Sequence, residues 1–132
     1  MTDIDAVLRE MDFDFFGEAK FKTTPEKFLG EPEAVLVDLR ADEERALVDL
    51  PLGGLVRTIP LPLAELPDRW EEIPADRPVG LLCSSHTRSA FAYLYLRARG
   101  RTNARILLQG YDGLLQEMKP GKIRARLRAR KG

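Results

Sequence analysis

Short apolar runs alternate with longer amphipathic stretches over most of this 132-residue chain. The apolar runs predict buried strands at residues 34–38, 79–83 and 104–108, with a shorter extended piece at 55–59. The amphipathic stretches predict helices at residues 24–29, 42–50, 63–73, 88–99 and 112–118. Within 42–50, the inward-facing stripe is expected at Ala46, Leu47 and Leu50. Continuous apolar strands that alternate with helices are typical of a parallel sheet covered on both faces. We therefore expect an α/β fold with a mostly parallel central sheet of about five strands.

Residues 1–23 predict an N-terminal extension that packs on this core. Apolar side chains recur there at helical spacing, at Ile4, Val7, Leu8 and Met11. Thr2, with Asp5 three residues later, is expected to cap that helix. A connection over residues 13–17 and a half-exposed strand over residues 19–23 follow. The main domain then spans residues 24–118.

Charge is distributed unevenly along a chain whose net charge is zero. Residues 1–50 carry a net charge of −8, whereas residues 119–132 hold seven bases and no acid. Apolar and basic residues alternate from Ile123 to Arg130, a period of two that predicts a basic C-terminal strand or tail. This segment is either a solvated edge or a docking arm for an acidic partner. Nucleic acid is the weaker alternative, because few exposed aromatic residues are expected to stack on bases.

Composition excludes several classes of protein. The 44% hydrophobic and 32% charged fractions fit a globular domain rather than a disordered chain. One cysteine and one histidine leave no disulfide framework and no zinc site of Cys and His ligands, so we expect no metal and no cofactor. No apolar run approaches the roughly 18 residues of a membrane helix. The first residues lack the basic cluster of a secretory signal, and we expect a cytoplasmic protein.

The polar segment after the second buried strand is the strongest candidate for chemistry. Cys83 ends that strand, a tight loop covers residues 84–87, and a helix is expected to begin at Arg88. Ligands of parallel sheets bind at the carboxyl ends of the strands. Amides that converge on a helix N-terminus favour negative charge, so the thiolate of Cys83 should be favoured. Arg88 and the loop hydroxyls add a cation and further donors. The alternative is an inert buried cysteine.

The segment from Cys83 to Ser89 reads Cys-Ser-Ser-His-Thr-Arg-Ser. It resembles the active-site loop of the rhodanese-like sulfurtransferases, whose common single-domain form reads Cys-x-x-Gly-x-Arg-Ser. The resemblance extends over about residues 24–117 through Val35-Leu-Val-Asp-Leu-Arg40 with Glu44, Ile59-Pro-Leu61, and residues 95–110. Two features depart from the family. His86 stands at the usual glycine, and no histidine precedes Ile59-Pro-Leu61 between residues 52 and 58.

The resemblance implies a two-step sulfur transfer. Cys83 would take sulfane sulfur from a donor such as thiosulfate, hold it as a persulfide and pass it to a thiol or cyanide. Arg88 would bind the donor's oxyanion or brace the loop. Asp38 and Arg40, at a neighbouring strand end, would orient that brace or form only a structural ion pair. The other expected contacts with substrate come from the loop residues Ser84, Ser85, His86, Thr87 and Ser89.

Some points stay open at the level of sequence. His86 either tunes the site or is a spectator. The basic segment would dock an acidic sulfur-carrier protein, if it docks anything. Phosphatases and arsenate reductases of similar fold place five residues between cysteine and arginine, whereas four lie between Cys83 and Arg88 here, which favours sulfur transfer. A non-catalytic or sulfur-carrier interaction module of the same family is the other alternative.

Overall fold

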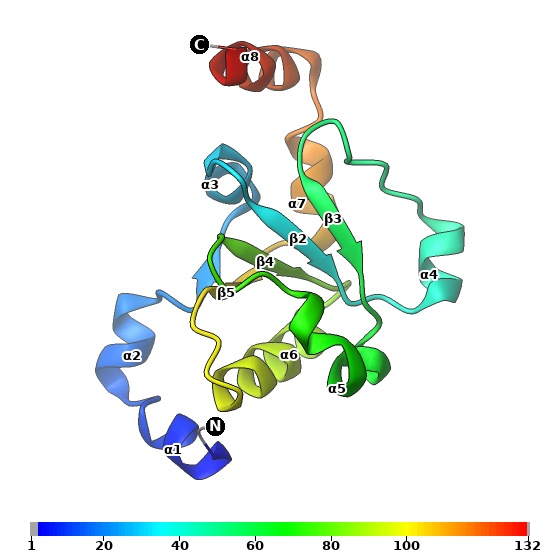
Figure 1. Cartoon of the computed structure of the whole chain (residues 1–132). Helices are drawn as coiled ribbons and strands as arrows, with labels where there is room; N and C mark the ends of the chain where they lie inside the picture. The colour runs from blue at the N-terminus through cyan, green and yellow to red at the C-terminus, as the bar shows by residue number, and fades with distance from the viewer. Residues whose placement is uncertain (1–2, 132) are drawn as a thin grey trace.

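A parallel sheet forms the centre of the molecule (Figure 1). The computed structural model describes residues 3–131, and within them the strands are β1 (Lys22–Thr23), β2 (Val35–Asp38), β3 (Arg57–Pro60), β4 (Val79–Leu82) and β5 (Ala104–Leu107). Their order across the sheet is β1-β5-β4-β2-β3, and every neighbouring pair is parallel. The expected α/β fold with five parallel strands is confirmed. The direction of strand order reverses between β2 and β4, which places a switch point at the ends of these two strands.

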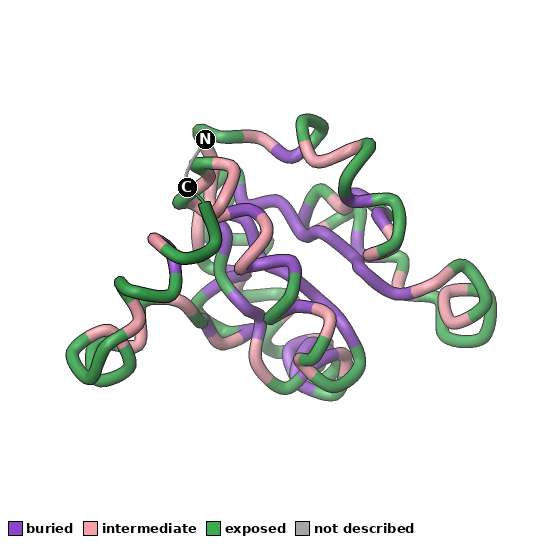
Figure 2. Tube along the Cα trace, turned by 90° about the horizontal axis from the view of Figure 1, so that it is seen from below, coloured by how far each residue is buried: buried purple, intermediate pink, exposed green. Residues whose placement is uncertain are grey.

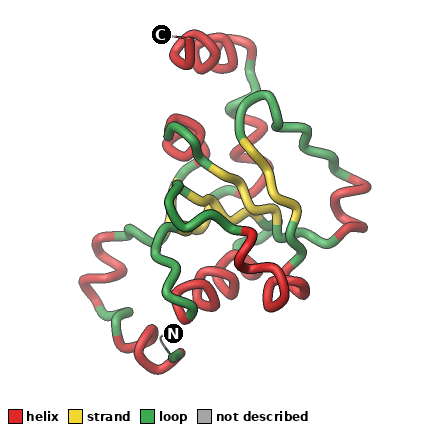
Figure 3. Tube along the Cα trace, in the orientation of Figure 1, coloured by secondary structure: helices red, strands yellow, loops and turns green. Residues whose placement is uncertain are grey.

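Helices cover both faces of the sheet (Figures 1 and 3). They are α1 (Ile4–Arg9), α2 (Phe13–Glu18), α3 (Pro25–Gly30), α4 (Asp42–Leu47), α5 (Leu66–Arg69) between the 3-10 turns η1 (Leu63–Glu65) and η2 (Trp70–Glu72), α6 (Thr87–Ala98), α7 (Gly110–Gln116) and α8 (Pro120–Lys131). One core cluster joins α5 and α6 to the sheet, and a second joins α3 and α7 to the opposite face. Alternate residues of each strand enter different clusters: Val35 and Val37 face α6, whereas Leu36 faces α3. Figure 2 shows these buried stretches running through the middle of the molecule.

The N-terminal extension differs from the expectation in three places. Residues 13–18 form helix α2 rather than a connection, because the Asp12 side chain accepts a hydrogen bond from the Phe15 amide and caps the first turn. The expected strand at 19–23 shrinks to Lys22–Thr23, because Ala19 ends α2 in a left-handed conformation. Asp3 caps α1, while the predicted cap Thr2 lies outside the described residues.

Helix α4 also departs from the prediction. It ends at Leu47, and Ala46 and Leu47 do not form an inward stripe: both are exposed, and Leu47 is 87% exposed. The helix lies outside the sheet edge formed by β3, where no layer of the core covers it (Figure 1). Periodicity alone could not show this, because the spacing of apolar residues does not reveal whether a partner surface exists.

The basic C-terminal segment is helix α8, and the predicted strand is wrong. Lys122 and Arg126 stand four residues apart on one face of this helix, and both pair with the buried Glu117 carboxylate, at 2.7 Å for Lys122. In a strand, all the alternating basic side chains from Lys122 to Arg130 would share one face, where like charges repel. The tertiary contact with Glu117 therefore favours the helix over the period of two.

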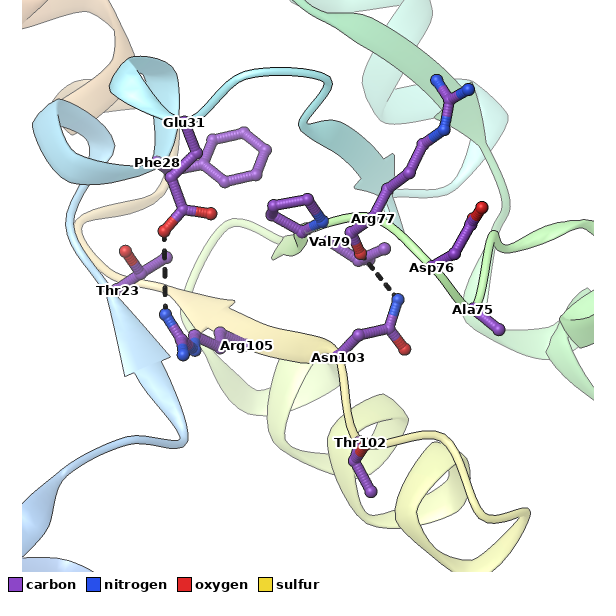
Figure 4. Close-up of a pocket in the computed structure, with 11 residues that line it drawn as sticks. Thr23, Phe28, Glu31, Ala75, Asp76, Arg77, Val79, Thr102, Asn103 and Arg105 are labelled. Carbon is purple, nitrogen blue, oxygen red and sulfur yellow. Dashed lines mark hydrogen bonds and ion pairs between the residues drawn. The ribbon is translucent and has the colours of Figure 1, made fainter.

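One cavity lies away from the predicted chemistry (Figure 4). Its volume is about 380 Å³, and it lies between α3 and the amino ends of β4 and β5. Asn103 donates to the Arg77 carbonyl oxygen at 2.7 Å, and Arg105 lies 3.8 Å from Glu31 across this cavity. None of the predicted site residues lines it. Among residues 3–131, no helix has the length and apolar character needed to cross a membrane.

Gly80, in the middle of β4, provides a test of this packing. A Cβ atom at Gly80 would lie 2.7 Å from Cε1 of the buried Phe28 ring. We expect Gly80→Ala to lower the free energy of unfolding by about 1–3 kcal/mol, because the ring must shift inside a closely packed core. Urea denaturation measures this, with Gly53→Ala as the control, since no atom lies within 4 Å of a Cβ at Gly53. Equal losses in both variants would contradict the packing described here.

Candidate active site

The strand order places Cys83 at the switch point of the sheet, where the chain leaves the neighbouring strands β2 and β4 toward opposite edges. Cys83 directly follows β4, and Asp38 ends the adjacent strand β2 with the register Asp38↔Leu82. The chain then turns sharply through residues 84–86 and enters α6 at Thr87. The predicted sequence of strand, polar loop and helix is therefore present, at the edge of the sheet where ligands of parallel α/β folds bind.

Several donors from the loop and from α6 point at the sulfur of Cys83. The Ser89 hydroxyl donates to Sγ at 3.1 Å, and the Ser89 amide donates to it at 3.4 Å. Burial raises the pKa of Cys83, but the Ser89 hydroxyl and the amides of Ser89, Ser85 and Arg88 outweigh it, and the pKa is lowered overall. Hydrogen bonds to the charged form favour it even in a poorly solvated place. The local geometry therefore stabilises a thiolate.

The same sulfur is completely covered. Cys83 is 0% exposed, and the hydroxyl that contacts it also lies 3.0 Å from the Leu81 carbonyl oxygen. Gly110 approaches the backbone of the same residue: its φ is +53°, and a Cβ there would lie 3.1 Å from the Cys83 carbonyl oxygen. Only a glycine fits this close approach without strain. A substrate can therefore reach Sγ only after the loop moves.

Arg88 braces the loop. Its guanidinium forms a two-pronged ion pair with Glu44 of α4, with Nη2 2.8 Å from Oε2, and it also donates to the Ser84 hydroxyl at 2.9 Å. These contacts hold the pKa of Glu44 at about 2, first through the Arg88 hydrogen bond and then through that of the Ala41 amide. Glu44 was not among the expected site residues. Its signal was its place in the segment that resembles the family, where it is the third residue of α4.

Asp38 and Arg40 do not contact Arg88. They form a buried ion pair with each other, with the Arg40 Nη2 atom 2.8 Å from Oδ2 of Asp38. Arg40 also donates to the Val48 carbonyl oxygen at 2.8 Å, and its guanidinium lies 5.0 Å from the centre of the Tyr111 ring. The pair connects the end of β2 to the segment after α4.

His86 fastens the loop to the turn before α7. Its backbone is left-handed, with φ of 67°, and its Nε2 atom accepts a hydrogen bond from the Gln109 amide at 2.9 Å. Gln109 is itself left-handed, with φ of 68°. A ring nitrogen that accepts this bond is not available as a base toward Cys83, and the bond connects the loop to the turn before α7. Sequence reasoning had no signal for the distant Gln109.

The remaining loop residues are open to solvent. Ser84, Ser85 and Thr87 are exposed, whereas Ser89 is buried against the sulfur. The three exposed residues therefore lie at the surface of the loop, and only Ser89 has its hydroxyl on the thiol. Within the described part of the chain, no three His, Cys, Asp or Glu side chains gather as metal ligands.

Comparison with known proteins gives a consistent picture. The sequence matches the rhodanese-like domain family over residues 24–117. A rhodanese-like domain protein from Staphylococcus aureus is 26% identical, with a TM-score of 0.57 over 70% of this chain and 89% of that chain. A rhodanese-related protein from Thermoplasma volcanium (19% identity, TM-score 0.59, 75% and 94% covered) and a single-domain sulfurtransferase from Saccharomyces cerevisiae (19%, 0.54, 73% and 89%) share the fold. No curated protein matches the sequence.

The lowered pKa of Cys83 predicts how the thiol titrates. In Ser89→Ala the hydroxyl donor is lost, so the thiolate is less stable and the pKa of Cys83 should rise. The ultraviolet absorbance of the thiolate, measured against pH with Cys83→Ser as the blank, reports this directly, because Cys83 is the only cysteine. Identical titration midpoints for the wild type and Ser89→Ala would contradict the assigned contact.

The left-handed backbone of His86 makes a second prediction. We expect His86→Val to lower the free energy of unfolding by about 2 kcal/mol or more, because a β-branched residue is strained there. His86→Gly should change it by less than about 1 kcal/mol, because glycine relieves the strain while water replaces the Gln109 acceptor. Urea denaturation distinguishes the two. A valine variant as stable as the glycine variant would show that this conformation does not constrain the loop.

Proposed function

Because this chain belongs to the rhodanese-like domain family, we propose that it is a sulfurtransferase that carries sulfane sulfur on Cys83. The donor is a small anionic sulfur compound such as thiosulfate, and the acceptor is a thiol or, in an assay, cyanide. The observation that carries the proposal is the pair of hydrogen bonds from the Ser89 hydroxyl and amide to Sγ, which, with the nearby backbone amides of Ser85 and Arg88, lower the pKa of Cys83 and favour an anionic sulfur at this place.

The transfer divides into two displacements. The Cys83 thiolate attacks the outer sulfur of thiosulfate, a new S–S bond forms, and sulfite leaves with the electron pair of the broken S–S bond. An acceptor thiolate or cyanide then attacks the outer sulfur of the persulfide, and Cys83 leaves as thiolate. Neither displacement requires a proton relay, which agrees with the engagement of the His86 ring nitrogen by the Gln109 amide.

The chain's own residues supply the charge stabilisation. Amide donors around Sγ continue to favour negative charge when it moves to the outer sulfur, and a charge-assisted hydrogen bond is worth about 1.5–3 kcal/mol. The Glu44–Arg88 ion pair holds the end of the loop, so these donors keep their places around Sγ while the loop is closed. The four residues between Cys83 and Arg88 form a smaller ring than the five of the related phosphatases, which fits one sulfur atom rather than a phosphate group.

Complete burial of Cys83 favours a second candidate, a non-catalytic interaction module of the same family. In that case the covered thiol would be a packed core residue, and the loop would serve only as a surface. The two candidates differ in one measurable property, which is whether Cys83 acquires sulfur.

Sulfur loading tests the proposal. After incubation with thiosulfate, the intact mass of the wild type should increase by one sulfur atom, and cyanide should then remove that atom as thiocyanate. Cys83→Ser should show no increase, because the nucleophile is absent. The measurement is repeated with 3-mercaptopyruvate and polysulfide, and circular dichroism confirms that both proteins are folded.

Two results would overturn the assignment. A folded wild type that gains no sulfur from any of the three donors would support the interaction module instead. Turnover of a phosphate or arsenate substrate without any sulfur loading would support the related phosphatase chemistry.

A further inference from the structure

The N-terminal helices carry an exposed apolar surface that is surrounded by acids. Phe13 and Phe16 stand three residues apart on α2 and are 89% and 56% exposed. The same helix carries the exposed acids Asp14 and Glu18, of which Glu18 forms an exposed ion pair with Lys20 at 3.4 Å. Residues 3–18 hold six acids and one base, Arg9. We name Phe13, Phe16, Asp14 and Glu18 the acidic face. Large aromatic side chains this exposed are uncommon on a monomer and typically mark an interface.

Helix α8 carries the complementary surface. Its inner side is occupied, because Lys122 and Arg126 pair with Glu117. The outer side is an open, shallow depression between side chains of α8 alone, formed by Pro120, Ile123, Arg124, Leu127 and Arg128, which we name the basic groove. Leu127 is 42% exposed, and no acid among residues 3–131 forms an ion pair with Arg124 or Arg128.

These two surfaces cannot meet within one molecule. Figure 1 shows α8 at one end of the molecule and α1 with α2 at the other, with the sheet and the helices that cover it between them. Helix α8 is also fixed in place, since its inner side is held by Glu117 of the preceding segment and by the Glu26 carbonyl oxygen, which accepts from Arg126 at 3.4 Å.

We propose that the acidic face of one copy of this chain docks in the basic groove of a second copy. The aromatic rings of Phe13 and Phe16 fill the groove beside Leu127, while Asp14 and Glu18 approach Arg124 and Arg128. Each surface combines an apolar centre with a rim in which one charge predominates, and the two charges are opposite, which is the arrangement of a steered and specific interface. No other partner needs to be invoked, because both halves of the interface belong to this chain.

The contact joins unlike surfaces, so it is heterologous. Such contacts give a closed assembly in two ways. Two copies can each dock their acidic face in the other's basic groove, or several copies can form a ring in which the last docks on the first. Every copy has one of each surface, so both closures satisfy all copies equally. The proposal concerns association alone and does not depend on the chemistry of Cys83, which lies on neither surface.

Sedimentation analysis of the full chain tests the proposal. We expect reversible association above the 14.9 kDa monomer. It should weaken about tenfold or more as ionic strength rises from about 0.01 M to about 1 M. Phe13→Ser should remove association at every ionic strength, and it should leave the fold unchanged because this ring is exposed. Asp68→Lys with Glu71→Lys, at exposed acids outside both surfaces, should associate like the wild type.

A charge exchange identifies the occupant. Arg124→Glu with Arg128→Glu, and separately Asp14→Lys with Glu18→Lys, should each give monomers. Mixing these two variants, or combining all four changes in one chain, should restore association, because opposite charges then face each other again.

Three outcomes would overturn the proposal. The first is a wild type that remains monomeric at all concentrations. The second is association that the four changes together do not restore. The third is a monomer whose α8 instead binds an acidic carrier protein, RNA or anionic vesicles, a binding lost in Arg124→Glu with Arg128→Glu. Sulfur loading of Cys83 is measured on the same variants, so failure of the interface and failure of the proposed function are separate results.

Discussion

The structure around Cys83 depends on one balance: a sulfur atom taken out of water but surrounded by hydrogen-bond donors. Burial by itself opposes a thiolate, and the Ser89 hydroxyl with the neighbouring amides reverses that effect. These donors are effective only while the loop keeps its shape. The shape in turn is held by the Glu44–Arg88 ion pair and by the bond from the Gln109 amide to His86. Residues from three separate segments therefore contribute to the state of one atom.

The sulfur that these donors stabilise is also fully buried. Gly110 packs against the Cys83 carbonyl oxygen, and His86 connects the loop to the same turn. Preorganisation and access thus compete at this site, since a loop held tightly enough to stabilise the thiolate also excludes a substrate. Loop opening is therefore a required step of the proposed reaction, and it is expected to influence the rate as in other enzymes with closing loops.

The periphery of the molecule shows why local patterns misled at particular places. The alternation of apolar and basic residues in 119–132 predicted a strand, but Glu117 holds Lys122 and Arg126 together on one side of a helix. Leu47 was expected inside, yet α4 has no layer above it. In both cases the deciding contact comes from outside the pattern. A period describes which residues share a face, and it says nothing about what that face meets.

The sequence alone determined the parallel α/β core, because continuous apolar strands require cover on both faces, and it placed Cys83 and Arg88 at the turn from a buried strand into a helix. Only the tertiary structure decided the partners. Asp38 turned to Arg40, Glu44 took Arg88, and the amide of Gln109 reached His86 across 23 positions of the chain. Pairing between distant segments depends on how the strands are ordered across the sheet, and strand order is not encoded in any local spacing of residues.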